Sequence, residues 1–210
     1  MRLRKWSLCL LLLPALEAVA RPDDGQDRCW RKGNHVISAG YGFPNIVSSL
    51  SNRYSNMGQD FKVGSVGPFF LNYEYAVNNL IGIAASGTWL KGHVSWTDRY
   101  GDPLRTPDTA GVRYQAAAGT VKVNFHFLRR EQFELYAGLG LGYSVITGES
   151  YLYDHNPDIS KLKVSNARFT PLVPDLGIGA RLYFVPFAGI FAQVGYSNMA
   201  IVQSGIQVKF

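Results

Sequence analysis

The sequence predicts an all-β fold: an eight-stranded antiparallel up-and-down β-barrel that spans a membrane. Apolar residues alternate with small or polar ones in stretch after stretch, which indicates strands with two different faces. The connections between these stretches are alternately long and short. Charged residues make up only 17% of the chain, below the roughly 25% of an average soluble protein. After residue 20, no apolar run approaches the roughly 20 residues that a spanning helix needs.

The first 20 residues have the pattern of a secretory signal peptide. Three basic residues precede a leucine-rich run that ends in Ala18 and Ala20, which is typical of a cleavage site. Cleavage there would lower the formal net charge from +6 to +4, a balance that does not favour nucleic acid binding. The expected organisation is a signal peptide over 1–20, a polar periplasmic lead-in over 21–34 and a transmembrane β-barrel over 35–210.

Cysteine usage excludes a disulfide framework, because Cys9 would leave with the signal peptide and Cys29 would remain alone. An acylated lipoprotein is the alternative, and it is disfavoured because neither cysteine follows a run of small residues.

Eight stretches alternate clearly enough to predict strands, and each is close to the 9 to 11 residues that cross a bilayer at a tilt. They run in order over 35–43, 66–76, 80–90, 114–128, 133–145, 175–184, 188–196 and 201–210. One face of each stretch is mainly apolar. In chain order this face carries Ile37, Ala39 and Tyr41; Phe69, Leu71 and Tyr73; Ile81, Ile83 and Trp89; Val121, Val123 and Phe125; Leu139, Leu141 and Tyr143; Leu176, Ile178 and Leu182; Ile190, Ala192 and Val194; and Val202, Ile206 and Val208.

The connections predict which end of the barrel faces outward. Long ones are expected over 44–64, 91–113 and 147–174, with a short fourth over 197–200 on the same side; tight links are expected over 77–79, 129–132 and 185–187. Long loops on one side and short turns on the other are typical of an outer-membrane barrel, whose short turns face the periplasm. An even number of strands places both chain ends there.

The residue types on the two faces indicate that lipid, not water, covers the apolar one. A soluble ligand-binding barrel would turn its large apolar residues inward. Here the second face is mostly Gly, Ala, Ser and Thr with scattered charges, and its large residues are Phe70, Tyr136, Tyr183 and Phe191. Aromatic residues of the apolar face gather near both strand ends and predict two interfacial girdles. They are Tyr41, Phe43, Phe69, Trp89, Tyr143 and Tyr196 at the long-loop end, and Tyr73, Tyr75, Phe125, Phe127, Phe133, Phe184 and Phe210 at the short-turn end.

The final segment GIQVKF, in which Val208 and Phe210 alternate, resembles the terminal signal by which the barrel assembly machinery recognises outer-membrane proteins. With the signal peptide and the eight strands, the chain is similar to the small outer-membrane barrels of the outer-membrane protein A and X type. The resemblance implies an integral protein of the Gram-negative cell envelope, located in the bacterial outer membrane.

Seven ionisable residues are expected to point into the barrel as an interior charge network: Glu74, Lys122, His126, Glu134, Asp175, Arg181 and Lys209. An eight-stranded lumen is about wide enough to be filled by side chains, so opposite charges should pair across it. Arg181 and Glu134 are the favoured pair because they come from adjacent strands at similar depth. The alternative is a gated polar pathway.

No catalytic, cofactor or metal site is predicted. Ser197 and Asn198 resemble part of the His-x-Ser-Asn segment of lipid A deacylase barrels, but Gly195 stands where that family has its general base. Two polar clusters are interpreted as ordinary exposed loops without dedicated ligand spacing. They are Tyr151, Tyr153, Asp154, His155 and Asp158, and Trp96, Asp98, Arg99, Tyr100 and Asp102.

The function predicted from these features is a non-enzymatic outer-membrane barrel that presents surface loops for envelope integrity or adhesion. Its expected partners are outer-membrane lipid, lipopolysaccharide, the barrel assembly machinery and a host or surface ligand reached through the long loops. A lipid-modifying enzyme and a narrow, porin-like small-solute channel are the alternatives.

Overall fold

The computed structural model describes residues 29–45, 59–98, 108–153, 162–197 and 199–210. Those ranges contain nine strands: β1 (His35–Asn45), β2 (Gln59–Ala76), β3 (Ile81–Asp98), β4 (Asp108–Arg129), β5 (Phe133–Tyr153), β6 (Leu162–Phe169), β7 (Leu172–Val185), β8 (Ala188–Ser197) and β9 (Ala200–Lys209). Across the same ranges, no helix combines the length and the apolar character needed to cross a bilayer.

The strands form a closed antiparallel ladder. Apart from β6 and β7, strands that follow one another in the chain are paired, and β1 also pairs with β9. β5 pairs with β6 along its outer half and with β7 along the remainder, so β6 and β7 share one position in the barrel. The break between them contains Pro171, which has no N–H to donate to a ladder. The described part of the chain is therefore an eight-stranded all-β barrel, and the predicted fold class is confirmed.

The predicted strand positions are correct, but three predicted long connections are wrong in extent. Residues 59–64, 91–98, 108–113, 147–153 and 162–169, which were expected in loops, continue the ladder as parts of β2 to β6. In these residues the outer face is polar, as at Lys91 and Arg113, whereas apolar residues such as Val94 and Tyr114 lie on the inner face. The pattern of apolar outside and polar inside therefore ends before the strands do. The short connections after β2, β4, β7 and β8 lie where they were predicted.

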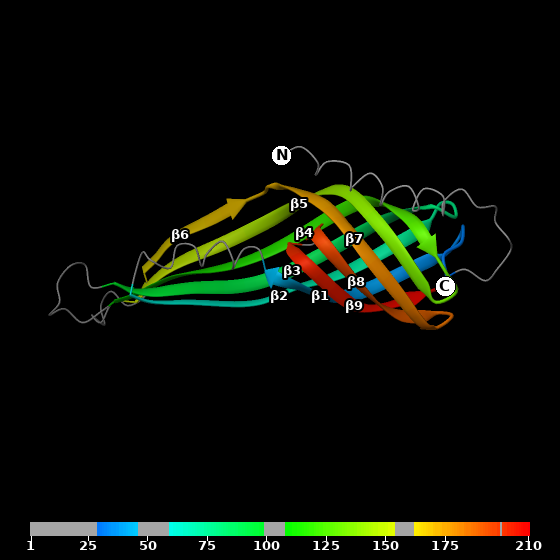
Figure 1. Ribbon diagram of the computed structural model, residues 1–210. Helices are drawn as coiled ribbons and strands as arrows, with labels where there is room; N and C mark the ends of the chain where they lie inside the picture. Colours follow the sequence, from blue (N-terminus) through cyan, green and yellow to red (C-terminus); the bar gives the residue numbers. More distant parts are fainter. Residues whose placement is uncertain (1–28, 46–58, 99–107, 154–161, 198) are drawn as a thin grey trace, which may run out of the picture.

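The longer strands produce an extension, defined here as residues 59–66, 91–98, 108–116, 146–153 and 162–169 of β2 to β6. It projects well beyond the ends of β1, β8 and β9, and it lies opposite the chain's C-terminus (Figure 1). The extension is a five-stranded curved sheet, whereas the remainder is a closed barrel. One end of the molecule therefore has a high wall on one side and a low rim on the other.

The two faces of the strands differ in burial as the alternation predicted. Leu139 and Ile206 on the outer face are each 66% exposed, whereas Glu134 and Asp175 on the inner face are fully buried. Most of the predicted girdle aromatics are exposed on the outside, while Phe127 and Phe133 are half-buried. The barrel thus places apolar side chains outside and charged ones inside.

Small residues on the inner face make room for large ones opposite them. Tyr136 of β5 lies directly across the ladder from Gly179 of β7, and a β-carbon added at Gly179 would overlap the Tyr136 ring. At the long-loop end, the lumen is filled by an apolar cluster of Leu90, Val94, Tyr114, Ala116, Ala118 and Met199. Close packing of this kind fills an eight-stranded barrel.

We expect Gly179→Ala to lower the free energy of unfolding by about 1–3 kcal/mol, the usual cost of forcing an extra methyl into a packed interior. The control is Gly87→Ala, because a β-carbon at Gly87 meets no atom within 4 Å. Urea unfolding of refolded protein in detergent, followed by tryptophan fluorescence, measures the difference. Equal stability of the two variants would contradict the packing described here.

Candidate functional site in the barrel interior

The ionisable residues predicted to point inward all lie on the inner face. Six of them are at most 5% exposed: Glu74, Lys122, His126, Glu134, Asp175 and Arg181. Lys209, near the end of β9, is half-buried. The structure divides the seven into a large cluster, a separate pair and one residue near the barrel mouth.

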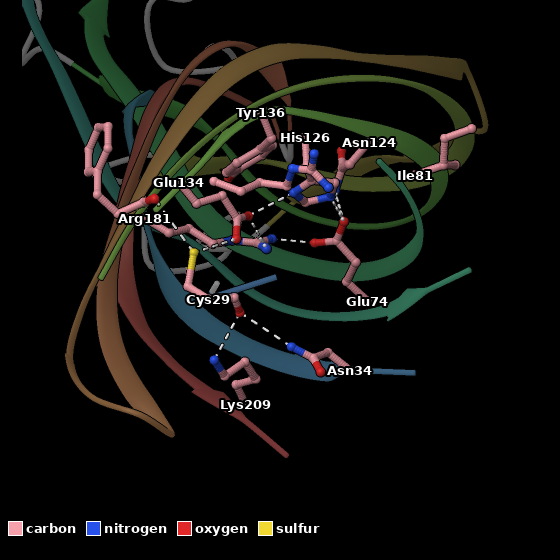
Figure 2. A network of polar contacts seen from close by, with 12 residues as sticks. Cys29, Asn34, Glu74, Ile81, Asn124, His126, Glu134, Tyr136, Arg181 and Lys209 are labelled. Carbon is pink, nitrogen blue, oxygen red and sulfur yellow. Dashed lines mark hydrogen bonds and ion pairs between the residues drawn. The ribbon is translucent and has the colours of Figure 1, made fainter. Parts of the chain in front are cut away.

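The large cluster, called the polar cluster below, consists of Glu74, His126, Glu134 and Arg181 (Figure 2). Arg181 and Glu134 are opposite each other in the β5–β7 ladder, and Arg181 Nη1 donates to Glu134 Oε1 at 2.9 Å. The same guanidinium crosses the lumen and donates through Nη2 to Glu74 Oε2 on β2. Arg181 therefore ties two non-neighbouring strands together, and its pair with Glu134 is the one that the sequence analysis selected.

His126 bridges the same two carboxylates from β4. Its Nδ1 lies 2.8 Å from Glu134 Oε1 and its Nε2 lies 3.0 Å from Glu74 Oε1. An ionised carboxylate only accepts hydrogen bonds, so with Glu74 and Glu134 both ionised the two ring nitrogens donate and His126 is an imidazolium. One guanidinium and one imidazolium then balance two carboxylates, which is the condition under which buried charges are tolerated.

Aromatic rings enclose the polar cluster on two sides. Trp30 stacks on the His126 ring at 3.7 Å between centroids, and the Tyr136 ring lies 5.8 Å from that of His126. The Arg181 guanidinium lies 4.5 Å from the centre of the Tyr136 ring. Cation–π contacts of this kind gain strength where water is excluded.

Residues 29–34 close the short-turn end of the barrel. Trp30 is fully buried and Cys29 is 1% exposed. The Cys29 N–H donates to the Arg130 carbonyl at 2.9 Å, and Lys209 Nζ donates to the Cys29 carbonyl at 2.9 Å. The Cys29 thiol donates to Glu134 Oε2 at 3.6 Å. Burial, with the neighbouring Glu134 carboxylate, raises the pKa of that thiol to about 12, so it is a neutral donor at neutral pH.

A second polar layer lies further along the lumen. Lys122 Nζ is 3.8 Å from Asp175 Oδ1, and Thr120 donates to Asp175 Oδ2 at 2.9 Å. Lys122 also donates to Gln193 Oε1 at 3.5 Å. A void of only about 10 Å³ lies among the residues between the two layers, about the minimum for a single water molecule.

Sequence reasoning missed Trp30 and Cys29 as parts of the interior. Both lie in a short segment before the first strand, where no periodicity marks a buried side chain. A tryptophan in an otherwise polar segment was the available signal, because a large aromatic residue gains most from burial.

The remaining candidate residues do not form a reactive site in the described ranges. The Ser197 side chain is fully buried, so its hydroxyl does not reach the outer surface where a lipid would lie. Asn198, Arg99, Tyr100, Asp102, Asp154, His155 and Asp158 lie outside the described residues. Within the described residues, no group of three or more His, Cys, Asp and Glu side chains is arranged to hold a metal ion.

No protein-family model matches the sequence, and a search of curated proteins finds no match. Among solved structures, the chain is similar to Ail, the attachment invasion locus protein of Yersinia pestis, with 18% identity and a TM-score of 0.41, over 85% of this chain and 99% of Ail. The same values apply to Ail in complex with the heparin analogue sucrose octasulfate. OprG from Pseudomonas aeruginosa gives 11% identity and a TM-score of 0.49, over 86% of this chain and 97% of OprG. The fold assignment rests on the closed ladder itself, not on these distant similarities.

We expect Arg181→Leu to destabilise the barrel by about 3–5 kcal/mol, because it leaves the carboxylates of Glu74 and Glu134 buried without their main counter-charge. Unfolding in urea with the protein held in detergent measures the loss. Combining Arg181→Leu with Glu74→Gln and Glu134→Gln should restore much of the stability, since His126 can then lose its proton and no uncompensated charge remains. If the triple variant were no more stable than Arg181→Leu, charge balance would not be the reason for the effect.

Proposed function

We propose that the chain is an integral outer-membrane barrel of a Gram-negative cell envelope. In this proposal it acts without catalysis and presents the connections of its extension at the cell surface, for envelope integrity or adhesion. The observation that carries the proposal is the inverted distribution of residue types, with apolar side chains outside and paired charges inside. The export signal predicted over 1–20 and the lead-in over 21–34 belong to the same proposal.

The outer face would be a poor solvent surface. Leu139, Ile178 and Ile206 are all more than 60% exposed, and outward neighbours such as Leu141, Leu176 and Val208 are exposed and apolar too. Monomeric soluble proteins rarely expose contiguous apolar patches beyond a few hundred Å². Hydrocarbon tolerates such a surface provided that the backbone is paired internally, and the closed ladder meets this condition.

Aromatic rows at both ends support a bilayer of defined thickness around the barrel. Tyr41, Phe69 and Trp89 follow one another across three paired strands on the outer face, and adjacent rings lie 5.3 and 6.4 Å apart. At the other end, His35 stacks on Phe210 at 5.5 Å. Aromatic girdles at both interfaces are a property of outer-membrane barrels.

The last strand supports the assembly part of the proposal. Val208 and Phe210 are exposed on the outer face, and the backbone of Phe210 pairs with that of His35 to complete the barrel seam. The residues that resemble an assembly signal therefore lie at the end of the chain that closes the barrel against β1. We propose the barrel assembly machinery as the partner that recognises them.

Two features support a role without catalysis or conduction. The Ser197 hydroxyl is buried, and the lumen is filled at three levels, by Trp30 with the polar cluster, by the layer around Lys122 and by the apolar cluster that includes Leu90. Opposite charges face each other in the polar cluster and in the Lys122–Asp175 pair, so we propose that they fix the shape of the barrel.

The membrane assignment predicts that Leu139→Arg destabilises the protein in bilayers by about 2–4 kcal/mol, the cost of a cation near the bilayer midplane. Leu139 lies midway between the two girdles on β5, between Phe133 and Tyr143. His93→Arg is the control, because His93 is exposed on the extension. Unfolding of protein refolded into vesicles measures both. Folding of the signal-free chain as a stable monomer in buffer without detergent would refute the assignment.

The filled lumen predicts that the purified protein gives no stable single-channel currents in planar bilayers. The Trp30→Ala variant should also give no stable currents, because the ion pairs of Arg181 and the apolar cluster still obstruct the lumen. Steady currents through the wild-type protein would instead support the narrow-channel alternative.

A further inference from the structure

A hollow of about 570 Å³ lies on the outer face of the extension, close to where the closed barrel begins. Its polar lining side chains come from four strands: Lys91, Arg113, Gln115, Thr147, Glu149 and Arg168. Three are basic and one is acidic, so the hollow carries an excess of positive charge. It shares no residue with the polar cluster, and Tyr114, a member of the apolar cluster, also borders it.

The backbone ladder fixes the relative positions of these side chains. Lys91 pairs with Gln115, Gln115 with Thr147 and Thr147 with Arg168, so the four form one row across β3, β4, β5 and β6. With strands about 4.8 Å apart, the row is roughly 15 Å long and has a cation at each end. Paired strands hold such a row more rigidly than a loop would.

The adjoining row contains the acid. Arg113 pairs with Glu149 in the ladder, so the one carboxylate of the hollow lies beside a guanidinium. Lys91 and Arg168 are both exposed and flank two neutral hydrogen-bonding side chains, Gln115 and Thr147. This arrangement suits an elongated ligand that has separated anionic groups and hydroxyls between them.

The row lies immediately beyond the apolar outer face. Lys91 follows the girdle residue Trp89 by two positions, a rise of roughly 7 Å along the strand. On β5, Thr147 likewise follows the outward-facing Val145 by two positions, and Tyr143, two positions earlier still, is 67% exposed. If lipid covers the apolar face, the cationic row is at the height of the outer-leaflet headgroups.

We propose that this row binds the phosphorylated sugar headgroup of an outer-leaflet glycolipid, a lipopolysaccharide. Arg168 and Lys91 would each contact a phosphate, since guanidinium binds phosphate through two donors and ammonium as a point charge. Gln115 and Thr147 would donate to the sugar between them. The inference rests on the proposed function, because it requires the apolar face to lie in the membrane.

The experiment compares Lys91→Gln/Arg168→Gln with wild-type protein refolded in detergent. The probes are purified lipopolysaccharide, the same material after its phosphates are removed with hydrofluoric acid, and free inorganic pyrophosphate. Dissociation constants are measured by microscale thermophoresis at two salt concentrations. The matched control is Lys62→Gln/Arg130→Gln, which removes the same two charges from exposed positions outside the hollow.

We expect the Lys91/Arg168 variant to bind intact lipopolysaccharide at least about tenfold more weakly, because charge-assisted hydrogen bonds to phosphate are lost. Its binding should also depend less on salt, and the control should stay within about twofold of wild type. Wild-type protein should bind the dephosphorylated material as weakly as the variant does.

Unchanged affinity of the Lys91/Arg168 variant for lipopolysaccharide would overturn the proposal, and so would equal wild-type affinity for intact and dephosphorylated material. Full displacement of lipopolysaccharide by millimolar pyrophosphate would also overturn it, because that result would indicate a site for free anions. The same samples are tested for heat-modifiable gel migration and for insertion into vesicles. These measurements show whether the headgroup site alone has failed or the proposed function as well. A barrel that inserts but does not select phosphorylated lipid refutes only the headgroup site. A chain that folds without detergent or lipid refutes both.

Discussion

Closure of the ladder between β1 and β9 is the constraint on which the rest of the structure depends. Once eight strands close, every residue of a strand faces either a narrow interior or the exterior, and no sheet edge remains in the closed part. A one-residue slip in register would exchange the two sets of side chains. The pairing of His35 with Phe210 fixes the register where the two ends of the chain meet. The opposite chemistry of the two faces therefore follows from closure combined with alternation.

The narrow interior explains why its charges are arranged as they are. Glu74 and Glu134 come from opposite sides of the lumen, and a buried carboxylate is costly unless it is paired. Arg181 and His126 each contact both carboxylates, so four strands share one electrically balanced cluster. Trp30 and Tyr136 both contact the His126 ring. The cluster links strands that the backbone ladder does not connect directly.

The sequence predicted the parts of this fold that are governed by a contrast between two faces. Outward Leu139 and inward Glu134 belong to one regular pattern, and so the strand positions, the inner residues and the pairing of Arg181 with Glu134 were accessible. The extension was not accessible from the sequence, because residues such as Lys91, Arg113 and Thr147 make its outer face polar. The apolar residues of these strands, such as Val94 and Tyr114, lie on the inner face instead, so the expected pattern of apolar outside and polar inside does not continue. Trp30 was missed for a different reason, since its burial depends on a three-dimensional fit and not on any period.

The extension gives the molecule an asymmetry that bears on its function. β1, β8 and β9 end close to the outer girdle, whereas β2 to β6 continue well beyond it. Pairing across the extension continues the backbone hydrogen bonds, so the wall is an ordered surface and not a set of independent loops. Its inner side packs apolar residues such as Val94 and Tyr114, and its outer side carries Lys91 and Arg168. A rigid wall of this kind can hold charged side chains at a fixed height above the apolar face, which a mobile loop cannot do.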